Sequence, residues 1–162
     1  MKKFRSEGNV DIDKDYVVGI DQSYTGFAIT VLQGDTFYTE VQPLKGTGVE
    51  RLQHSQILVD RACSGSVRAV AVEGYAFNAT KAAHMQGELG GAIRLALENH
   101  FSGVPLIIPP TVVKKYATGR GSAKKSEILL GVYKKWGVDF SDDNAADSYV
   151  LARIAQEGTT LV

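Results

Sequence analysis

The 162-residue chain has little of what several protein classes require. It contains one cysteine, Cys63, so it can form neither an internal disulfide framework nor a zinc site built from its own cysteines, and we expect this thiol to be inert. No stretch approaches the roughly 18 consecutive apolar residues of a membrane helix. The first fifteen residues lack the apolar run of a secretory signal. We therefore expect a cytoplasmic protein with no membrane partner.

An excess of charge of one sign is also lacking, because 18 basic and 18 acidic residues give a net charge of zero. The distribution is uneven, however. From position 114 to 135 only Glu127 opposes the basic residues, which are Lys114, Lys115, Arg120, Lys124, Lys125, Lys134 and Lys135. The next twelve residues contain four aspartates and no Lys or Arg. Such neighbours suit a protein that holds phosphates with one segment and metal ions with the other, although two solvated helix faces would give the same pattern.

Hydrophobic periodicity and turn signals predict the order of the elements. Residues 1–14 are expected to be a flexible lead-in, and residues 15–162 a single domain. The expected strands are 16–21, 25–32, 36–41, 67–73 and 104–108, and the expected helices are 49–63, 79–100, 122–136 and 144–157. A hairpin meander followed by alternating strands and helices predicts an α/β fold, with a mixed five-stranded sheet and helices on both of its faces.

Three glycines in the expected helix 79–100 are unusual, because each costs about 1 kcal/mol relative to alanine in a helix. Gly87, Gly90 and Gly91 therefore indicate that something packs close to this helix. The partner is either the protein's own sheet or a second subunit. The histidines, His54, His84 and His100, have no metal-ligand spacing, so we expect surface or packing roles for them.

Acidic residues stand where two buried strands are expected to end. Asp21 follows Val-Val-Gly-Ile, and Glu73 follows Val-Ala-Val. In parallel neighbouring strands their side chains would lie about 5 Å apart. Two carboxylates that close repel each other unless a proton or a cation intervenes, and Mg²⁺ prefers oxygen ligands. The segment from Asp142 to Asp147 is expected to begin a helix whose first turns add further oxygen ligands.

Four segments resemble the RuvC family of Holliday junction resolvases, whose fold is RNase H-like. The resemblance rests on Gly19-Ile-Asp-Gln-Ser-Tyr-Thr-Gly26, Val72-Glu-Gly-Tyr-Ala-Phe77, the lysine- and glycine-rich stretch 114–126, and Asn144-Ala-Ala-Asp147. Together they span nearly the whole chain. The resemblance implies an endonuclease that hydrolyses phosphodiesters of four-way DNA, acting as a homodimer with two Mg²⁺ ions, for which Mn²⁺ substitutes, in each active site.

The resemblance also implies roles for individual residues. Metal ligands would be Asp21, Glu73 and Asp147, with Lys114 and Lys125 as catalytic lysines near the scissile phosphate. The family often has a fourth acid where this chain has Asn144, which would coordinate through its carbonyl oxygen or leave the role to Asp143. The remaining expected DNA contacts are Lys115, Arg120, Lys124, Tyr75, Phe77 and Lys81.

Three alternatives remain open at this point. A broader nuclease would also cut flaps, forks or three-way branches, and a protein with an incomplete metal site would bind junctions without cutting them. An actin-like phosphotransferase would also have a Gly-Ile-Asp loop of this kind, but it needs two domains and the chain is long enough for one. A bacterial cell or a bacteriophage-infected host is the expected setting.

Overall fold

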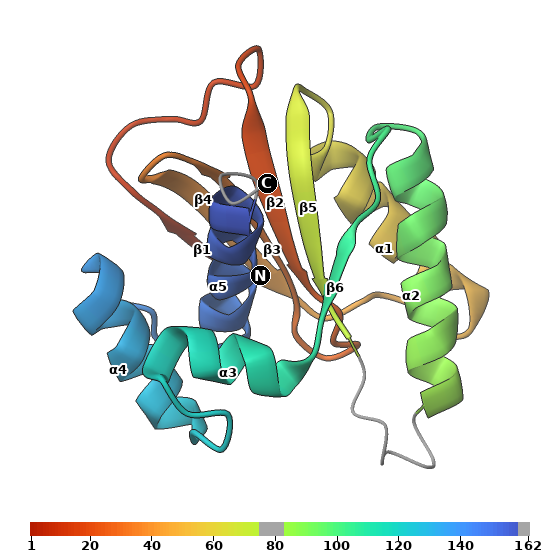
Figure 1. Ribbon diagram of the computed structural model, residues 1–162. Helices are drawn as coiled ribbons and strands as arrows, with labels where there is room; N and C mark the ends of the chain where they lie inside the picture. Colours follow the sequence, from red (N-terminus) through yellow and green to blue (C-terminus); the bar gives the residue numbers. More distant parts are fainter. Residues whose placement is uncertain (75–82, 159–162) are drawn as a thin grey trace.

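The computed structural model describes residues 1–74 and 83–158. Within these ranges the chain forms six strands and five helices (Figure 1). The strands are β1 (Lys2–Arg5), β2 (Tyr16–Asp21), β3 (Phe27–Gln33), β4 (Thr36–Gln42), β5 (Val67–Glu73) and β6 (Leu106–Ile108). The helices are α1 (Val49–Ala62), α2 (Ala83–Glu98), α3 (Pro110–Thr118), α4 (Lys125–Trp136) and α5 (Asp143–Gly158). In this part of the chain, no helix is both long and apolar enough to cross a membrane.

The sheet is mixed, with the strand order β1-β4-β3-β2-β5-β6. The meander β2-β3-β4 is antiparallel, as is the pair of β1 with β4, whereas β5 runs parallel to both β2 and β6. The α/β class and the mixed sheet are confirmed. Because β2 and β5 are parallel neighbours, their carboxyl ends meet at one edge, which is the edge where β5 runs into the grey segment in Figure 1.

Helices cover both faces of the sheet, which explains why β2 is a continuous buried run instead of an alternating one. On one face, Val17 packs into a core shared with α3, α4 and α5. On the other face, Val18 and Ile20 pack into a core shared with α1 and α2. Figure 1 shows these two helical groups on opposite sides of the strands.

Helix α5 approaches the sheet closely at Gly19. A Cβ at this position would lie 2.1 Å from the carbonyl oxygen of Ser148 and 2.4 Å from the main-chain nitrogen of Ala152, so only glycine permits this contact. Buried hydroxyls reinforce the contact, because Thr30 Oγ1 lies 2.8 Å from Ser148 Oγ and 2.7 Å from Thr39 Oγ1. The first turns of α5 are therefore held firmly against β2 and β3.

The sheet contains one more strand than the sequence predicted. Lys2–Arg5 lies in the expected flexible lead-in, yet it pairs with β4 as an edge strand, so this part of the prediction is wrong. Lys3 faces one side of the sheet, whereas Phe4 packs on Phe140 at a ring-centroid distance of 5.3 Å on the other. Contacts with distant parts of the chain thus stabilise a segment too short and polar to be recognised locally.

Helix α3 was also not predicted. Pro109 and Pro110 end β6, but Pro110 additionally begins a helix that runs to Thr118. Proline is favoured in the first helical turn because its fixed φ suits a helix and its missing N–H would have no partner there. Lys114 and Lys115, which the sequence analysis placed in a glycine-rich stretch, therefore lie on a helix.

Candidate active site

The carboxyl groups of Asp21 and Glu73 lie side by side at the edge where β2 and β5 end. Asp21 is 4% exposed, and the charge of Glu73 acts directly on its carboxyl group. Burial raises the pKa of Asp21 well above its usual range, and the neighbouring Glu73 raises it further. Burial also raises the pKa of Glu73. The two acids thus meet as expected, and burial disfavours the ionised form of both.

Asp147 of α5 is the third acid at this edge. Burial raises its pKa to about 7, with further contributions from the charges of Glu73 and Asp143. Its Oδ1 atom is buried and has no hydrogen-bond partner among the described residues. A buried carboxylate oxygen without a partner is expensive, so this atom is available to a ligand that the protein itself does not supply.

Two lysines lie beside the three acids. The charge of Lys114, on α3, partly opposes the pKa increases of Glu73 and Asp147. Lys125, the first residue of α4, forms an ion pair of 2.5 Å with Asp143. This hydrogen bond raises the pKa of Lys125, and the charges of Asp147 and Asp21 add to the effect. The fold therefore brings cationic groups from two helices to the acidic edge of the sheet.

The three consecutive residues 142–144 at the start of α5 make different contacts. Asp142 caps the helix, because its Oδ1 accepts hydrogen bonds from the main-chain N–H groups of Asn144 and Ala145 at 3.0 and 3.2 Å. Asp143 pairs with Lys125. The Asn144 carboxamide packs over Gly26, where a Cβ would lie only 2.2 Å from its Nδ2. Asn144 thus faces the turn that follows β2, and Asp143 is already paired with a lysine.

The other predicted DNA contacts are less tightly tied to the acids. Lys115 and Lys124 are exposed, and Arg120 pairs with Glu127 on the same surface. Tyr75, Phe77 and Lys81 lie outside the described residues. Sequence reasoning missed Gln22, which is buried beside Asp21 and bonds to the main chain of Glu73. Its only signal was a polar residue directly after a strand-end acid. The roles of all these residues stay predictions.

The donor set suits a divalent cation of the Mg²⁺ class, since it consists of carboxylate oxygens, one of them buried and unpartnered. In residues 1–74 and 83–158, no three acidic, histidine or cysteine side chains form a ready-made metal cluster. Carboxylates gathered this closely repel one another, and the charge of Glu73 raises the pKa of both Asp21 and Asp147.

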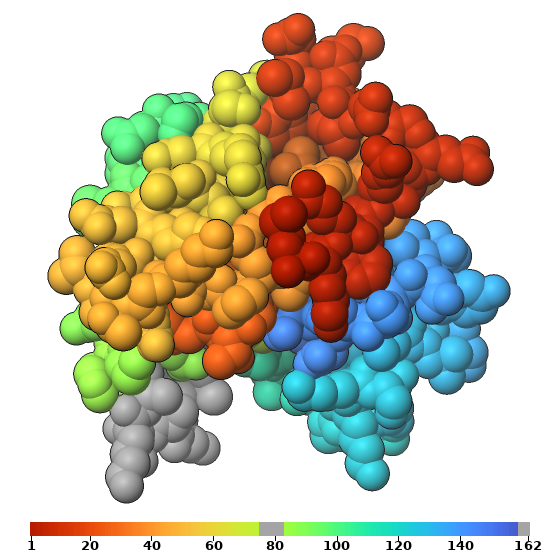
Figure 2. Space-filling view, turned by 180° about the vertical axis from the view of Figure 1, so that it is seen from behind, coloured from red at the N-terminus to blue at the C-terminus, as the bar shows by residue number. Residues whose placement is uncertain are grey.

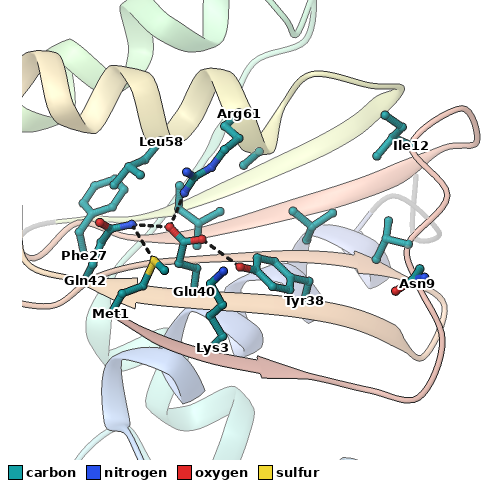
Figure 3. Close-up of a pocket in the computed structure, with 14 residues that line it drawn as sticks. Met1, Lys3, Asn9, Ile12, Phe27, Tyr38, Glu40, Gln42, Leu58 and Arg61 are labelled. Carbon is teal, nitrogen blue, oxygen red and sulfur yellow. Dashed lines mark hydrogen bonds and ion pairs between the residues drawn. The ribbon is translucent and has the colours of Figure 1, made fainter.

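A pocket of about 450 Å³ lies elsewhere, between α1 and the face of the sheet opposite α5. Figure 3 shows Glu40 at its centre, bonded to Tyr38, Gln42 and Arg61. In the view from behind (Figure 2), the N-terminal residues lie beside the orange surface that includes α1. Among the predicted site residues that the structure describes, none lines this pocket, so it is separate from the acidic edge of the sheet.

Comparison with solved structures identifies the architecture. The structure of RuvC from Thermus thermophilus matches with a TM-score of 0.67 and 25% sequence identity, over 89% of this chain and 97% of that chain. The chain has the fold of the RuvC resolvases. A second structure, T. thermophilus RuvC in complex with a Holliday junction substrate, matches with a TM-score of 0.65 and 26% identity, over 85% of this chain and 90% of that one. No protein-family model matches the chain, and no curated protein matches it in sequence. The RuvC likeness expected from the four segments is confirmed at the level of structure.

Proposed function

We propose that this protein is a metal-dependent endonuclease that resolves four-way DNA junctions by cutting symmetry-related phosphodiesters. The observation that carries the proposal is the convergence of Asp21, Glu73 and Asp147 beside Lys114 and Lys125, within a RuvC fold. The three acids are each more than 50 residues apart in sequence, so their proximity is not a consequence of closeness along the chain.

Asp21, Glu73 and Asp147 would hold two Mg²⁺ ions, or Mn²⁺ in their place, with an oxygen of Asp143 or Asn144 completing the set. When bound, such ions activate water and stabilise the leaving oxygen of a phosphodiester. The protein's own residues supply the rest. Burial of the acids excludes bulk water from the site, and Lys114 and Lys125 would place ammonium groups against the charge that develops on the phosphate.

Lys125 would also respond to binding at the site, because its ammonium group is paired with Asp143. A phosphate of the substrate offers this lysine an alternative anionic partner, and a metal ion offers one to Asp143. Substrate and metal binding would thus both loosen the same ion pair. The exposed position of Lys125, whose side chain is 81% exposed, leaves it free to make that exchange.

The proposed partners are branched DNA and a second copy of the chain. The basic residues of α3 and α4 lie next to the acids and would hold the phosphate backbone. For the homodimer we propose the outer face of α2. The sequence left open whether the protein's own sheet or a second subunit packs on this helix. A Cβ at Gly87 or Gly91 would meet nothing within 4 Å, and Leu95, one turn beyond Gly91, is 66% exposed. Two-fold symmetry would match that of a four-way junction, and we propose a cytoplasmic setting for the reaction.

The decisive experiment uses a four-way junction with a mobile core and a linear duplex of the same sequence. Paired nicks at symmetric positions are expected in the junction only, and only with Mg²⁺ or Mn²⁺. Asp21→Asn and Asp147→Asn should abolish the nicks while still binding the junction in Ca²⁺. Arg68→Gln, which changes a charge on the strand β5 away from its acidic end, is the matched control and should cut normally.

A non-cleaving junction-binding protein is the second candidate, and Asn144 favours it because the carboxamide supplies no charge to the site. Junction binding without nicks in any divalent metal would establish this function and refute the nuclease. Cutting of flaps and three-way branches at rates equal to those of four-way junctions would instead indicate the broader nuclease.

A further inference from the structure

Gln22 joins the two strand ends that carry the acid pair. It follows Asp21 directly, and it is 7% exposed. Its Nε2 donates a hydrogen bond of 2.5 Å to the main-chain carbonyl of Glu73. A side chain that starts next to one acid therefore holds the main chain of the other.

The main chain alone does not provide this link. The registered pairing of β2 with β5 ends at Ile20 and Val72, one residue before the two acids. On its far side, the end of β5 is held by the main chain, because Gly74 N donates to Ile108 O of β6 at 2.8 Å. On the β2 side, the side chain of Gln22 takes the carbonyl of Glu73 instead. Gln22 thus extends the connection between β2 and β5 to the level of the acids.

The bond from Gln22 to Glu73 holds β2 and β5 together at the point where the two acids repel each other. Asp21 and Glu73 repel each other whenever both are ionised, and they must both be ionised to hold a cation. The carboxamide also carries a cost, because its Oε1 is buried without a hydrogen-bond partner among the described residues. An apolar side chain of similar length would avoid that cost but would leave the carbonyl of Glu73 without this donor.

We propose that Gln22 is a positioning residue, which fixes the separation of the Asp21 and Glu73 carboxyl groups and thereby the affinity of the pair for a divalent cation. The inference rests on the proposed function, because it presumes that these two acids are metal ligands. Gln22 itself touches neither metal nor substrate in this scheme.

The test measures Mn²⁺ binding to the DNA-free protein by titration calorimetry. Gln22→Met keeps the length of the side chain and removes the donor, and we expect Mn²⁺ affinity to fall by about tenfold or more, as is typical when a partner of a metal ligand is removed. Gln42→Met is the matched control, because Gln42 is also nearly buried and its carboxamide also bonds a neighbour, but in the pocket of Figure 3. Its Mn²⁺ affinity should stay within about twofold of wild type.

Cleavage kinetics provide the second readout. With a four-way junction, Gln22→Met should lower kcat and leave KM for the DNA unchanged, and a large excess of Mn²⁺ should restore most of the rate. If Gln22→Met fails to fold, Gln22→Asn replaces it, since this side chain keeps the amide but is one methylene too short to reach the carbonyl. The free energy of unfolding of each variant is measured in urea, to show that it is folded.

Wild-type Mn²⁺ affinity in a folded Gln22→Met or Gln22→Asn protein would overturn the inference, whatever its stability, because the residue would then serve the fold alone. A different result would overturn the proposed function itself. If the wild-type protein binds no Mn²⁺, or if Asp21→Asn binds it as well as wild type, the acids are not metal ligands and the inference fails with them.

Discussion

Replacing Asp147 by asparagine should stabilise the metal-free protein while it abolishes cleavage. Asp147 has an ordinary pKa of 3.8, which burial and the neighbouring acids raise to about 7 in the folded state. The folded protein therefore binds a proton more tightly than the unfolded chain between these two values. The contribution of Asp147 to the free energy of unfolding therefore falls as the pH rises from 3.8 to about 7.

The size of this effect follows from the difference between the two pKa values. Each pKa unit corresponds to about 1.36 kcal/mol, so the shift of Asp147 from 3.8 to about 7 corresponds to about 4 kcal/mol. This is a ceiling, because Glu73 and Asp143 share the repulsion and the site relaxes when one charge is removed. We expect Asp147→Asn to gain about 2 kcal/mol of unfolding free energy at pH 8 in EDTA, and little at pH 4.

Urea unfolding at pH 4 to 8 measures this directly. The chain has a single tryptophan, Trp136, whose ring lies 5.8 Å from that of Tyr149 on α5, so its fluorescence reports the loss of this core. Asp142→Asn is the control, and its effect on stability should be opposite to that of Asp147→Asn. Burial raises the pKa of Asp142, but Lys2 and the helix N–H groups lower it overall, so this variant should lose stability at neutral pH.

Mg²⁺ should make the wild-type protein more stable than Asp147→Asn, because a ligand stabilises only a chain that binds it. Saturating Mg²⁺ should raise the midpoint of wild-type unfolding clearly and that of Asp147→Asn little. Equal stability of both proteins at pH 8 in EDTA, with the same dependence on pH, would refute the view that Asp147 is a strained, unpartnered acid.

Three further predictions follow from the same contacts. Gly19→Ala should cost about 3 kcal/mol or more in urea unfolding, because the new methyl would overlap Ser148 and Ala152 in a rigid main-chain contact; a loss below about 1 kcal/mol would show that α5 can move away. Cys63 is buried and its pKa is raised by burial to about 12, so it should react with thiol reagents only as fast as the protein unfolds; rapid labelling of the native state would contradict its burial. Asn144→Asp adds a fourth acid, so it should strengthen Mn²⁺ binding several-fold in calorimetry and lower the metal-free stability; an unchanged affinity would place residue 144 outside the site.

The strands that carry the site could be predicted from the sequence with high accuracy. Tyr16–Asp21 and Val67–Glu73 have the predicted bounds, because each contains a buried apolar run, residues 16–20 and 69–72, that an acid ends sharply. Helix α5 was predicted to within one residue at each end, from its cap and its small residues. Local sequence was enough here, since the residues at the ends of each element, an acid or a helix cap, mark where it ends or begins.

Elements that depend on distant partners could not be predicted in this way. Lys2–Arg5 becomes a strand only because β4 offers it an edge and Phe140 a packing partner. The bond from Gln22 to Glu73 and the ion pair of Lys125 with Asp143 join residues that no local pattern connects. The glycines of α2 show the same limit, since composition does not reveal that Gly90 is buried while Gly87 and Gly91 face open space.

The three acids occupy positions 21, 73 and 147, and each sits on a different element. During synthesis, β2 and β5 are complete long before α5, so a growing chain has the acid pair but lacks its third member. If the proposed nuclease needs all three acids, it would therefore stay inactive until α5 has been made and has docked on Gly19.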